Sequence, residues 1–142
     1  MTRVVLVLIA AAIANVLGWV LPVVDDKRGW VAFRVALSPL VPYEQYHIEQ
    51  WRLVLLSVSS SFTNVLFWVV AIALLRGLSR RASRLCLWLA AGATLLNLHW
   101  TVTMGDSAND LEIGYFVWVV SFALLALAAF LELAKTASKR AA

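Results

Sequence analysis

Residues 76–84 read Arg-Gly-Leu-Ser-Arg-Arg-Ala-Ser-Arg, and this stretch decides the fold of the chain. It carries four arginines and no acidic residue, and a long apolar run lies on each side of it. A helix needs about 20 apolar residues to cross the roughly 30 Å of hydrocarbon in a bilayer. A basic turn between two runs of that length is typical of a loop on the cytoplasmic side of a membrane.

The composition of the whole chain also favours a membrane protein. Hydrophobic residues make up 63% of the 142 residues, and charged residues only 14%. Soluble domains are usually about 45–50% apolar, and a soluble fold of this size could not bury so much additional apolar surface. The excess is concentrated in four runs that are each long enough to span a bilayer. The sequence therefore predicts an all-α, polytopic membrane protein, a single domain over residues 1–142 built as a four-transmembrane-helix bundle.

The ends of the apolar runs set the predicted spans and their connections. The transmembrane helices cover residues 4–24, 53–75, 85–104 and 113–133. The connections are an outer loop, 25–52, a cytoplasmic loop, 76–84, a second outer loop, 105–112, and a cytoplasmic tail, 134–142.

The first outer loop contains an additional short element over residues 30–37. This stretch is too short to span a bilayer, and Arg34 interrupts its apolar residues. Trp30 and Phe33 are suited to dip into the headgroup region, which predicts a short helix lying in the membrane interface. Proline follows at positions 39 and 42 and ends this helix.

Positive charge is distributed unequally between the two predicted sides. The side of the 76–84 loop carries eight cationic residues: Arg3, the four loop arginines, Lys135, Lys139 and Arg140. The opposite side carries four, all within residues 25–52. The positive-inside rule therefore predicts cytoplasmic N- and C-termini, in a bacterial inner (plasma) membrane. Because orientation explains the net charge of +4, no nucleic-acid partner is predicted.

The sequence offers little for catalysis. Its single cysteine, Cys86, excludes the paired-thiol chemistry of the four-helix quinone-linked thiol oxidoreductases. Four spans in a short chain resemble the architecture of the small multidrug-resistance transporters, but residues 4–24 lack the membrane-embedded glutamate of that family. No nucleophile and base stand at a recognisable spacing. We therefore predict a non-enzymatic protein with no cofactor and no bound metal.

Polar residues inside the predicted spans are the first group of candidates for function. Asn15 lies near the middle of the first span. Two stripes at helical spacing follow on the second and third spans: Ser57, Ser60, Ser61 and Asn64, and then Thr94, Asn97 and Thr101. We expect the stripes to face each other, since they lie at equal depth on antiparallel neighbours. They are either interhelical glue or the lining of a polar cavity, or in an oligomer of a pore, open to the outside.

The second group of candidates lies on the predicted outer side. It comprises Trp30, Arg34, Tyr43, Glu44, His47, His99, Asp106 and Asp110. Glu44 and His47 have the Glu-x-x-His spacing that places two metal ligands on one helical face, but no second motif supports a metal site. His99 is either an ordinary interface histidine or an ionisable group that functions inside a span.

Three hypotheses for function follow from these patterns. The leading one is a small integral membrane protein of accessory, immunity or regulatory type, which acts through helix–helix and outer-loop interactions. Its partners are the lipid bilayer and a second membrane protein or a further copy of the chain. The alternative is a small channel, transporter or membrane-disrupting effector that uses the polar stripes. The second alternative is a membrane enzyme with a lipid substrate.

Overall fold

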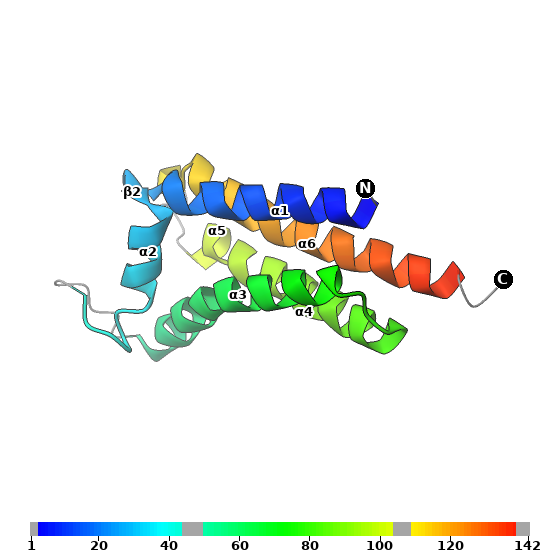
Figure 1. Cartoon of the computed structure of the whole chain (residues 1–142). Coiled ribbons are helices and arrows are strands. Elements are labelled where there is room, and N and C mark those ends of the chain that lie inside the picture. Colours follow the sequence, from blue (N-terminus) through cyan, green and yellow to red (C-terminus); the bar gives the residue numbers. More distant parts are fainter. Residues whose placement is uncertain (1–2, 44–49, 104–108, 139–142) are drawn as a thin grey trace.

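The computed structural model describes residues 3–43, 50–103 and 109–138, and most of them are helical (Figure 1). Four helices are long and apolar enough to cross a membrane. They are α1 (Arg3–Val20), α3 (Trp51–Leu75), α4 (Arg80–Leu98) with its short continuation α5 (Trp100–Thr103), and α6 (Ile113–Ser138). The expected all-α bundle with four long apolar helices is confirmed.

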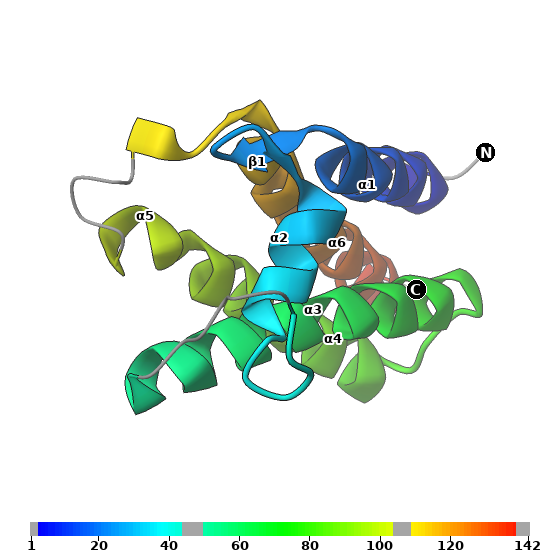
Figure 2. The same ribbon diagram turned by 90° about the vertical axis from the view of Figure 1, so that its left-hand side faces the viewer.

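The helices are arranged around α6, which packs along α1 and along α4. α3 packs on α4 and makes a smaller contact with α6. The start of α1, the end of α6 and the α3–α4 turn lie at one end of the bundle, which we call the arginine end (Figure 1). The short helix α2 (Gly29–Ala36) crosses the opposite end, which we call the capped end (Figure 2).

Aromatic and small side chains share the core between these helices. Phe67 of α3 and Phe122 of α6 are almost fully buried and meet edge to face, with 5.4 Å between ring centroids. Ala128 and Ala129 of α6 are fully buried and let neighbouring helices approach closely. The outward faces of the long helices are apolar as well, so the bundle is hydrophobic all round.

The first predicted span, 4–24, is wrong at its C-terminal end, because α1 stops at Val20. Pro22 has no N–H to continue the helix. Residues Pro22–Val24 instead form β1, which pairs antiparallel with β2 (Lys27–Arg28). Asp25 and Asp26 join the two strands with φ of 48° and 59°. Left-handed conformations at both central residues define the two-residue turn that matches the twist of a hairpin.

The predicted cytoplasmic loop, 76–84, is also shorter than expected, because α4 begins at Arg80. Gly77 adopts a left-handed φ of 75° just after α3 ends. The Ser79 side chain then accepts a hydrogen bond of 3.4 Å from the backbone N–H of Ala82 and caps α4. Arginine is a good helix former, so the basic residues that follow the cap extend the helix.

Two further boundaries differ from the predicted spans. The third span breaks near its end, where His99 caps α4 and α5 follows after it. The fourth helix continues past residue 133 to Ser138. Glu132 and Lys135 lie three positions apart on one face and form an ion pair of 3.2 Å, which supports the additional helical turn.

The capped end is held by close backbone packing. α2 matches the predicted 30–37 helix to within one residue. A Cβ on Gly29 would lie 2.0 Å from the carbonyl oxygen of Gly18, and one on Gly114 would lie 2.3 Å from that of Pro22. Only glycine allows such an approach, so the hairpin and the start of α2 are fixed against the ends of α1 and α6.

The hairpin is also hydrogen-bonded to the residues that directly precede α6. The backbone N–H of Asp26 donates to the Glu112 carboxylate at 2.6 Å, and the Glu112 N–H donates to the Val23 carbonyl at 2.9 Å. Val24 and Leu111 form an isolated antiparallel bridge. These contacts bring residues far apart in the sequence together beside α2 (Figure 2).

Candidate functional site

A cavity of about 350 Å³ lies beneath α2 at the capped end. Its volume falls within the roughly 300–1,000 Å³ of small-molecule sites in proteins. Helices α1, α2, α3, α5 and α6 and the hairpin contribute to the lining, which is mostly apolar and has a polar wall on α3. We call it the cap cavity.

The apolar walls of the cap cavity come from α1, α2 and the strand β1, which contributes Val23 and Val24. Trp19 of α1 and Phe33 of α2 pack against each other with 5.0 Å between ring centroids. Ala32 and Ala36 of α2 complete the roof, and the small size of these two side chains leaves space below it. The walls are therefore suited to an apolar ligand.

The polar wall is the predicted stripe of α3, Ser57, Ser60, Ser61 and Asn64, and all four residues line the cavity. Three of these side chains bond to their own helix, two of them through serine hydroxyls. The Ser57 hydroxyl donates to the Val54 carbonyl at 3.2 Å, and the Ser61 hydroxyl donates to the Ser57 carbonyl at 2.9 Å. Such bonds satisfy a serine hydroxyl within an apolar helix bundle.

Asn97 connects the polar wall to the rest of the bundle. Its side-chain oxygen accepts from the Ser60 hydroxyl at 2.7 Å, and its amide donates to the Thr63 hydroxyl at 3.1 Å. Its backbone carbonyl accepts from the Tyr115 hydroxyl at 2.6 Å. The indole N–H of Trp100 donates to the Ser60 hydroxyl at 3.3 Å. Because the network joins α3, α4, α5 and α6, it holds the polar wall in one position.

Trp118 of α6 closes the wall on the other side. Its indole N–H donates to the Asn64 side-chain oxygen at 2.9 Å, and the Asn64 amide donates to the Ser61 carbonyl at 3.2 Å. A Cβ on Gly18 would lie 2.6 Å from the Cβ of Trp118, so α1 and α6 are in near contact here. Gly18 and Trp118 therefore form part of the cavity lining at the point where α1 and α6 meet.

Asn15 lies outside the cap cavity and bonds α1 to α6. Its amide donates to the Ser121 hydroxyl at 3.2 Å, and Ser121 in turn donates to the Trp118 carbonyl at 2.6 Å. The Asn15 side-chain oxygen is buried and has no hydrogen-bond partner in the described part of the chain. The structure thus places Asn15 at a helix–helix contact rather than with the α3 stripe.

The predicted stripe on the third span meets α3 only in part. Asn97 is fully buried and bonds to α3, as described above. Thr94 donates to the Ala90 carbonyl at 2.8 Å, and Thr101 donates to the Leu98 carbonyl at 2.7 Å. Among the residues that the structure describes, these two threonines make side-chain bonds only within their own helical segment. The face-to-face arrangement therefore depends on one residue of the three.

The described residues of the predicted outer-face set are spread over the capped end. Trp30 is exposed, and the Arg34 guanidinium lies over the Tyr43 ring, 4.2 Å from its centroid. His99 packs on Trp100 with ring centroids 4.6 Å apart, and its Nδ1 contacts the Leu96 carbonyl. Its Nε2 is buried without a partner among the described residues. Asp110 is exposed. These side chains do not form a single site.

The remaining outer-face predictions concern metal binding. Glu44, His47 and Asp106 lie outside the described residues. Within residues 3–43, 50–103 and 109–138, no three His, Cys, Asp or Glu side chains come together as a metal site would require. The Glu-x-x-His motif is therefore left as a sequence observation.

Sequence interpretation missed the aromatic part of the cap cavity. Trp19, Trp100, Trp118 and Tyr115 all line the cavity, and none of them is among the candidate residues named from the sequence. A usable signal was present on α6, where aromatic residues recur at positions 115, 118 and 122. That spacing places them on one helical face, toward the bundle.

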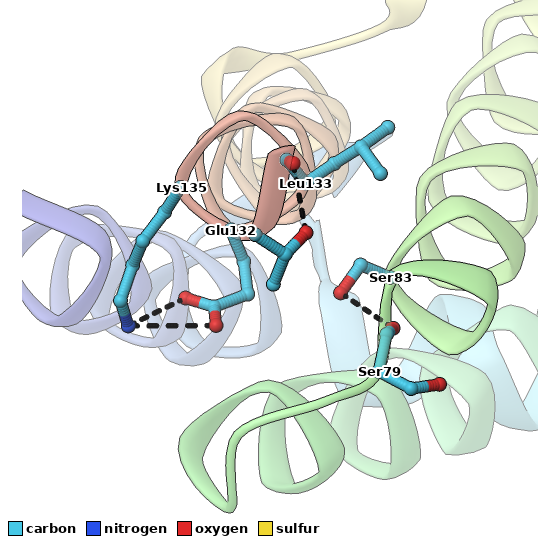
Figure 3. A network of polar contacts seen from close by, with 6 residues as sticks. Ser79, Ser83, Glu132, Leu133 and Lys135 are labelled. Atoms are coloured by element: carbon cyan, nitrogen blue, oxygen red, sulfur yellow. Dashed lines mark hydrogen bonds and ion pairs between the residues drawn. The ribbon is translucent and has the colours of Figure 1, made fainter. Parts of the chain in front are cut away.

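A buried acid at the arginine end was missed as well. Glu132 is only 5% exposed, and its carboxylate pairs with the half-exposed Lys135 (Figure 3). Ser83 is fully buried nearby on α4 and donates to the Ser79 carbonyl at 3.1 Å (Figure 3). These groups pack directly against protein and are not among the residues that line the cap cavity.

No protein-family model matches this chain, and no match was found among the curated proteins or the solved structures. The class of protein is therefore defined by its own features. It is a helical bundle with four helices long enough to span a membrane and a ligand-sized cavity under one end.

Proposed function

We propose that this protein is a non-enzymatic integral membrane protein whose capped end binds a small apolar ligand beneath α2. The observation that carries the proposal is the cap cavity of about 350 Å³, with apolar walls and one polar wall held by hydrogen bonds. Sites for small molecules have this composition, a mostly apolar concave surface with a few fixed polar groups.

The outward surface of the bundle supports its insertion in a membrane. Large apolar side chains are exposed on the outer faces of the long helices, for example Ile13 on α1, Phe62 on α3 and Phe130 on α6. Such a surface is stable in hydrocarbon and not in water. The four arginines of residues 76–84 are exposed together at the arginine end, which we assign to the cytoplasmic side of a bacterial plasma membrane.

With this orientation, α2 lies at the outer interface of the membrane. The exposed Trp30 is suited to the headgroup region, and the Arg34 side chain is placed beside Tyr43. Because α2 is both the roof of the cavity and part of the outer surface, a partner protein or a second copy that contacts the outer loop would contact this roof. The accessory or regulatory role expected from the sequence is thus compatible with ligand binding.

The hydrogen bonds of the polar wall favour binding over ion conduction. A conduction path needs polar groups that can bond to a passing ion in place of water. Here Ser60, Thr63 and Asn97 bond to one another, and Asn64 bonds to Trp118. These groups therefore serve mainly to position the wall.

The proposal is tested by tryptophan fluorescence with bromohexanol, a small amphiphile whose bromine quenches nearby indoles. Three tryptophans line the cavity, so a bound probe quenches them at saturation. The protein is reconstituted in phosphatidylcholine nanodiscs, and quenching is corrected for probe partitioning into the lipid. We expect Ala36→Leu, which fills the roof of the cavity, to remove the saturable component.

Ala10→Leu is the matched control, because Ala10 is exposed on the outer face of α1, away from the cavity. This variant should quench like the parent protein. Quenching that is non-saturable, or that Ala36→Leu leaves unchanged, would contradict the proposed function.

A further inference from the structure

The hydrogen bonds around the cap cavity determine which ligand chemistry it accepts. Each hydroxyl and indole on its lining has one hydrogen to donate. The Ser57 hydroxyl donates to the Val54 carbonyl, the Ser60 hydroxyl to the Asn97 side-chain oxygen, and the Ser61 hydroxyl to the Ser57 carbonyl. The Trp100 indole donates to the Ser60 hydroxyl, the Tyr115 hydroxyl to the Asn97 backbone carbonyl, and the Trp118 indole to the Asn64 side-chain oxygen. These six donors are therefore already used within the protein, whereas the indole N–H of Trp19, also on the lining, makes no hydrogen bond to a described residue.

Acceptor capacity remains on the same wall. A serine oxygen can accept through its lone pairs while its hydrogen is donated elsewhere. The hydroxyl oxygens of Ser57 and Ser61 accept no hydrogen bond from any residue that the structure describes, and both side chains are nearly fully buried. The polar wall thus offers two buried acceptors one helical turn apart, and a ligand group that donates would satisfy them.

One donor on this wall is left over. The Asn64 amide carries two hydrogens, and one of them goes to the Ser61 carbonyl. The second has no acceptor among the described residues. A ligand hydroxyl, which donates one hydrogen and accepts through its oxygen, would match one of the two serine oxygens and this N–H together.

The charges at the edge of the cavity favour an uncharged ligand. Asp25 and Lys27 both line its edge, and they form an ion pair with 3.6 Å between Nζ and Oδ2. The pair has no net charge, so nothing on the described lining compensates the desolvation of an ammonium or a carboxylate. The geometry points to a neutral molecule with an apolar body and a hydroxyl group, bound with the hydroxyl donating to Ser57 or Ser61. This inference rests on the proposed function.

The test compares bromohexanol with its isomer, bromopentyl methyl ether. The two molecules contain the same atoms, and the ether lacks the hydrogen-bond donor. After correction for partitioning into protein-free nanodiscs, we expect the alcohol to bind about five- to tenfold more tightly than the ether, because one neutral hydrogen bond contributes a factor of that size to the affinity. Equal affinities would overturn the inference and leave the proposed function standing. Saturable binding of neither isomer would reject both.

A double variant, Ser57→Ala with Ser61→Ala, assigns the effect to the two acceptors. The double variant should bind the alcohol only as tightly as it binds the ether. Its affinity for the ether should equal that of the parent protein. A loss for both isomers would indicate altered structure and contradict the assignment. Ser83→Ala is the matched control, since Ser83, like Ser61, donates to the carbonyl four residues earlier and lies at the other end of the bundle. It should preserve the preference for the alcohol.

The choice of lipid separates two sources of the hydroxyl. Phosphatidylcholine has no donor in its headgroup, whereas diacylglycerol is uncharged and carries a hydroxyl. Weaker binding of bromohexanol in phosphatidylcholine nanodiscs that contain diacylglycerol would identify a bilayer lipid as a competitor for the site. Unchanged binding would identify a free alcohol as the ligand class, and loss of the preference over the ether in phosphatidylcholine would overturn the inference.

Discussion

The two ends of the bundle handle their polar groups differently. At the capped end, the side chains of α3 and α6 bond to one another around the edge of a cavity. At the arginine end, Glu132 and Ser83 are buried and bond within their own helices (Figure 3). Ser61 and Ser83 make the same type of bond to the carbonyl four residues earlier, yet only Ser61 lines the cavity. A local hydrogen-bond pattern therefore does not reveal a binding site.

The difference follows from what covers each end. The arginine end has a turn of only four residues, 76–79, between two long helices. The capped end has a hairpin and a helix that lie across the bundle. Two of the side chains that α2 directs at the cavity, Ala32 and Ala36, are too small to fill the space beneath this crossing helix. The cavity is the result.

The largest expected effect concerns the packing of the cap. In Gly29→Ala, the new Cβ would lie 2.0 Å from the Gly18 carbonyl oxygen, so α2 must move away from α1. We expect a loss of about 3 kcal/mol in the free energy of unfolding, the upper range for overpacking, together with loss of bromohexanol binding. Unfolding in mixed detergent micelles measures the first effect and fluorescence quenching the second.

Gly92→Ala is the control for that substitution, because a Cβ on Gly92 meets nothing within 4 Å. An alanine inside a helix should leave stability unchanged or raise it by up to about 1 kcal/mol. Equal destabilisation by the two variants would show that the capped end is not tightly packed.

The second prediction concerns the buried network. Asn97→Leu removes the acceptor of Ser60 and the donor to Thr63, and leaves both hydroxyls without that partner. We expect about 2 kcal/mol of destabilisation, as for unsatisfied buried polar groups. Thr94→Val, one turn earlier on α4, loses only a bond to its own helix and should cost less than about 0.5 kcal/mol. A reversed order would place the contact between the two stripes at Thr94.

The third prediction concerns the buried carboxylate at the arginine end. In Glu132→Gln the buried charge is removed while a polar group remains, and the half-exposed Lys135 can be hydrated. The change in unfolding free energy should stay within about 1 kcal/mol, because burial of a charge offsets much of the gain from pairing it. Binding of bromohexanol should not change. An altered affinity for the probe would mean that the two ends are coupled.

The smallest effect is expected in the hairpin turn. Asp26 has a φ of 59°, a conformation that glycine adopts without strain. Asp26→Gly should stabilise the protein by up to about 1 kcal/mol, since its backbone N–H can still donate to Glu112. Asp26→Ala keeps the strain and should give no gain. Equal stability of the two variants would argue against a left-handed turn.

Much of the architecture was predictable because its determinants are local. Apolar runs of membrane-spanning length and the basic turn at 76–84 predict four long helices, and all four are present. The position of α2 follows from apolar residues bounded by a glycine and by prolines. The spacing of Ser57, Ser60, Ser61 and Asn64 predicts one polar helical face, and that face lines the cavity. Length, hydropathy and period are properties of short segments of chain.

The rest depends on contacts between distant segments. Tertiary packing placed the end of the first predicted span in a hairpin and buried Glu132. It also brought Asn97, and neither Thr94 nor Thr101, into hydrogen-bonding contact with α3. It also brought Trp19, Tyr115 and Trp118 together around one space. The last of these outcomes depends on how closely α1, α2 and α6 approach at Gly18, Gly29 and Gly114. The sequence by itself determined which segments are helical and which faces are polar. The backbone contacts at three glycines, set by helix crossings that no local pattern encodes, decided which faces meet and where a cavity remains.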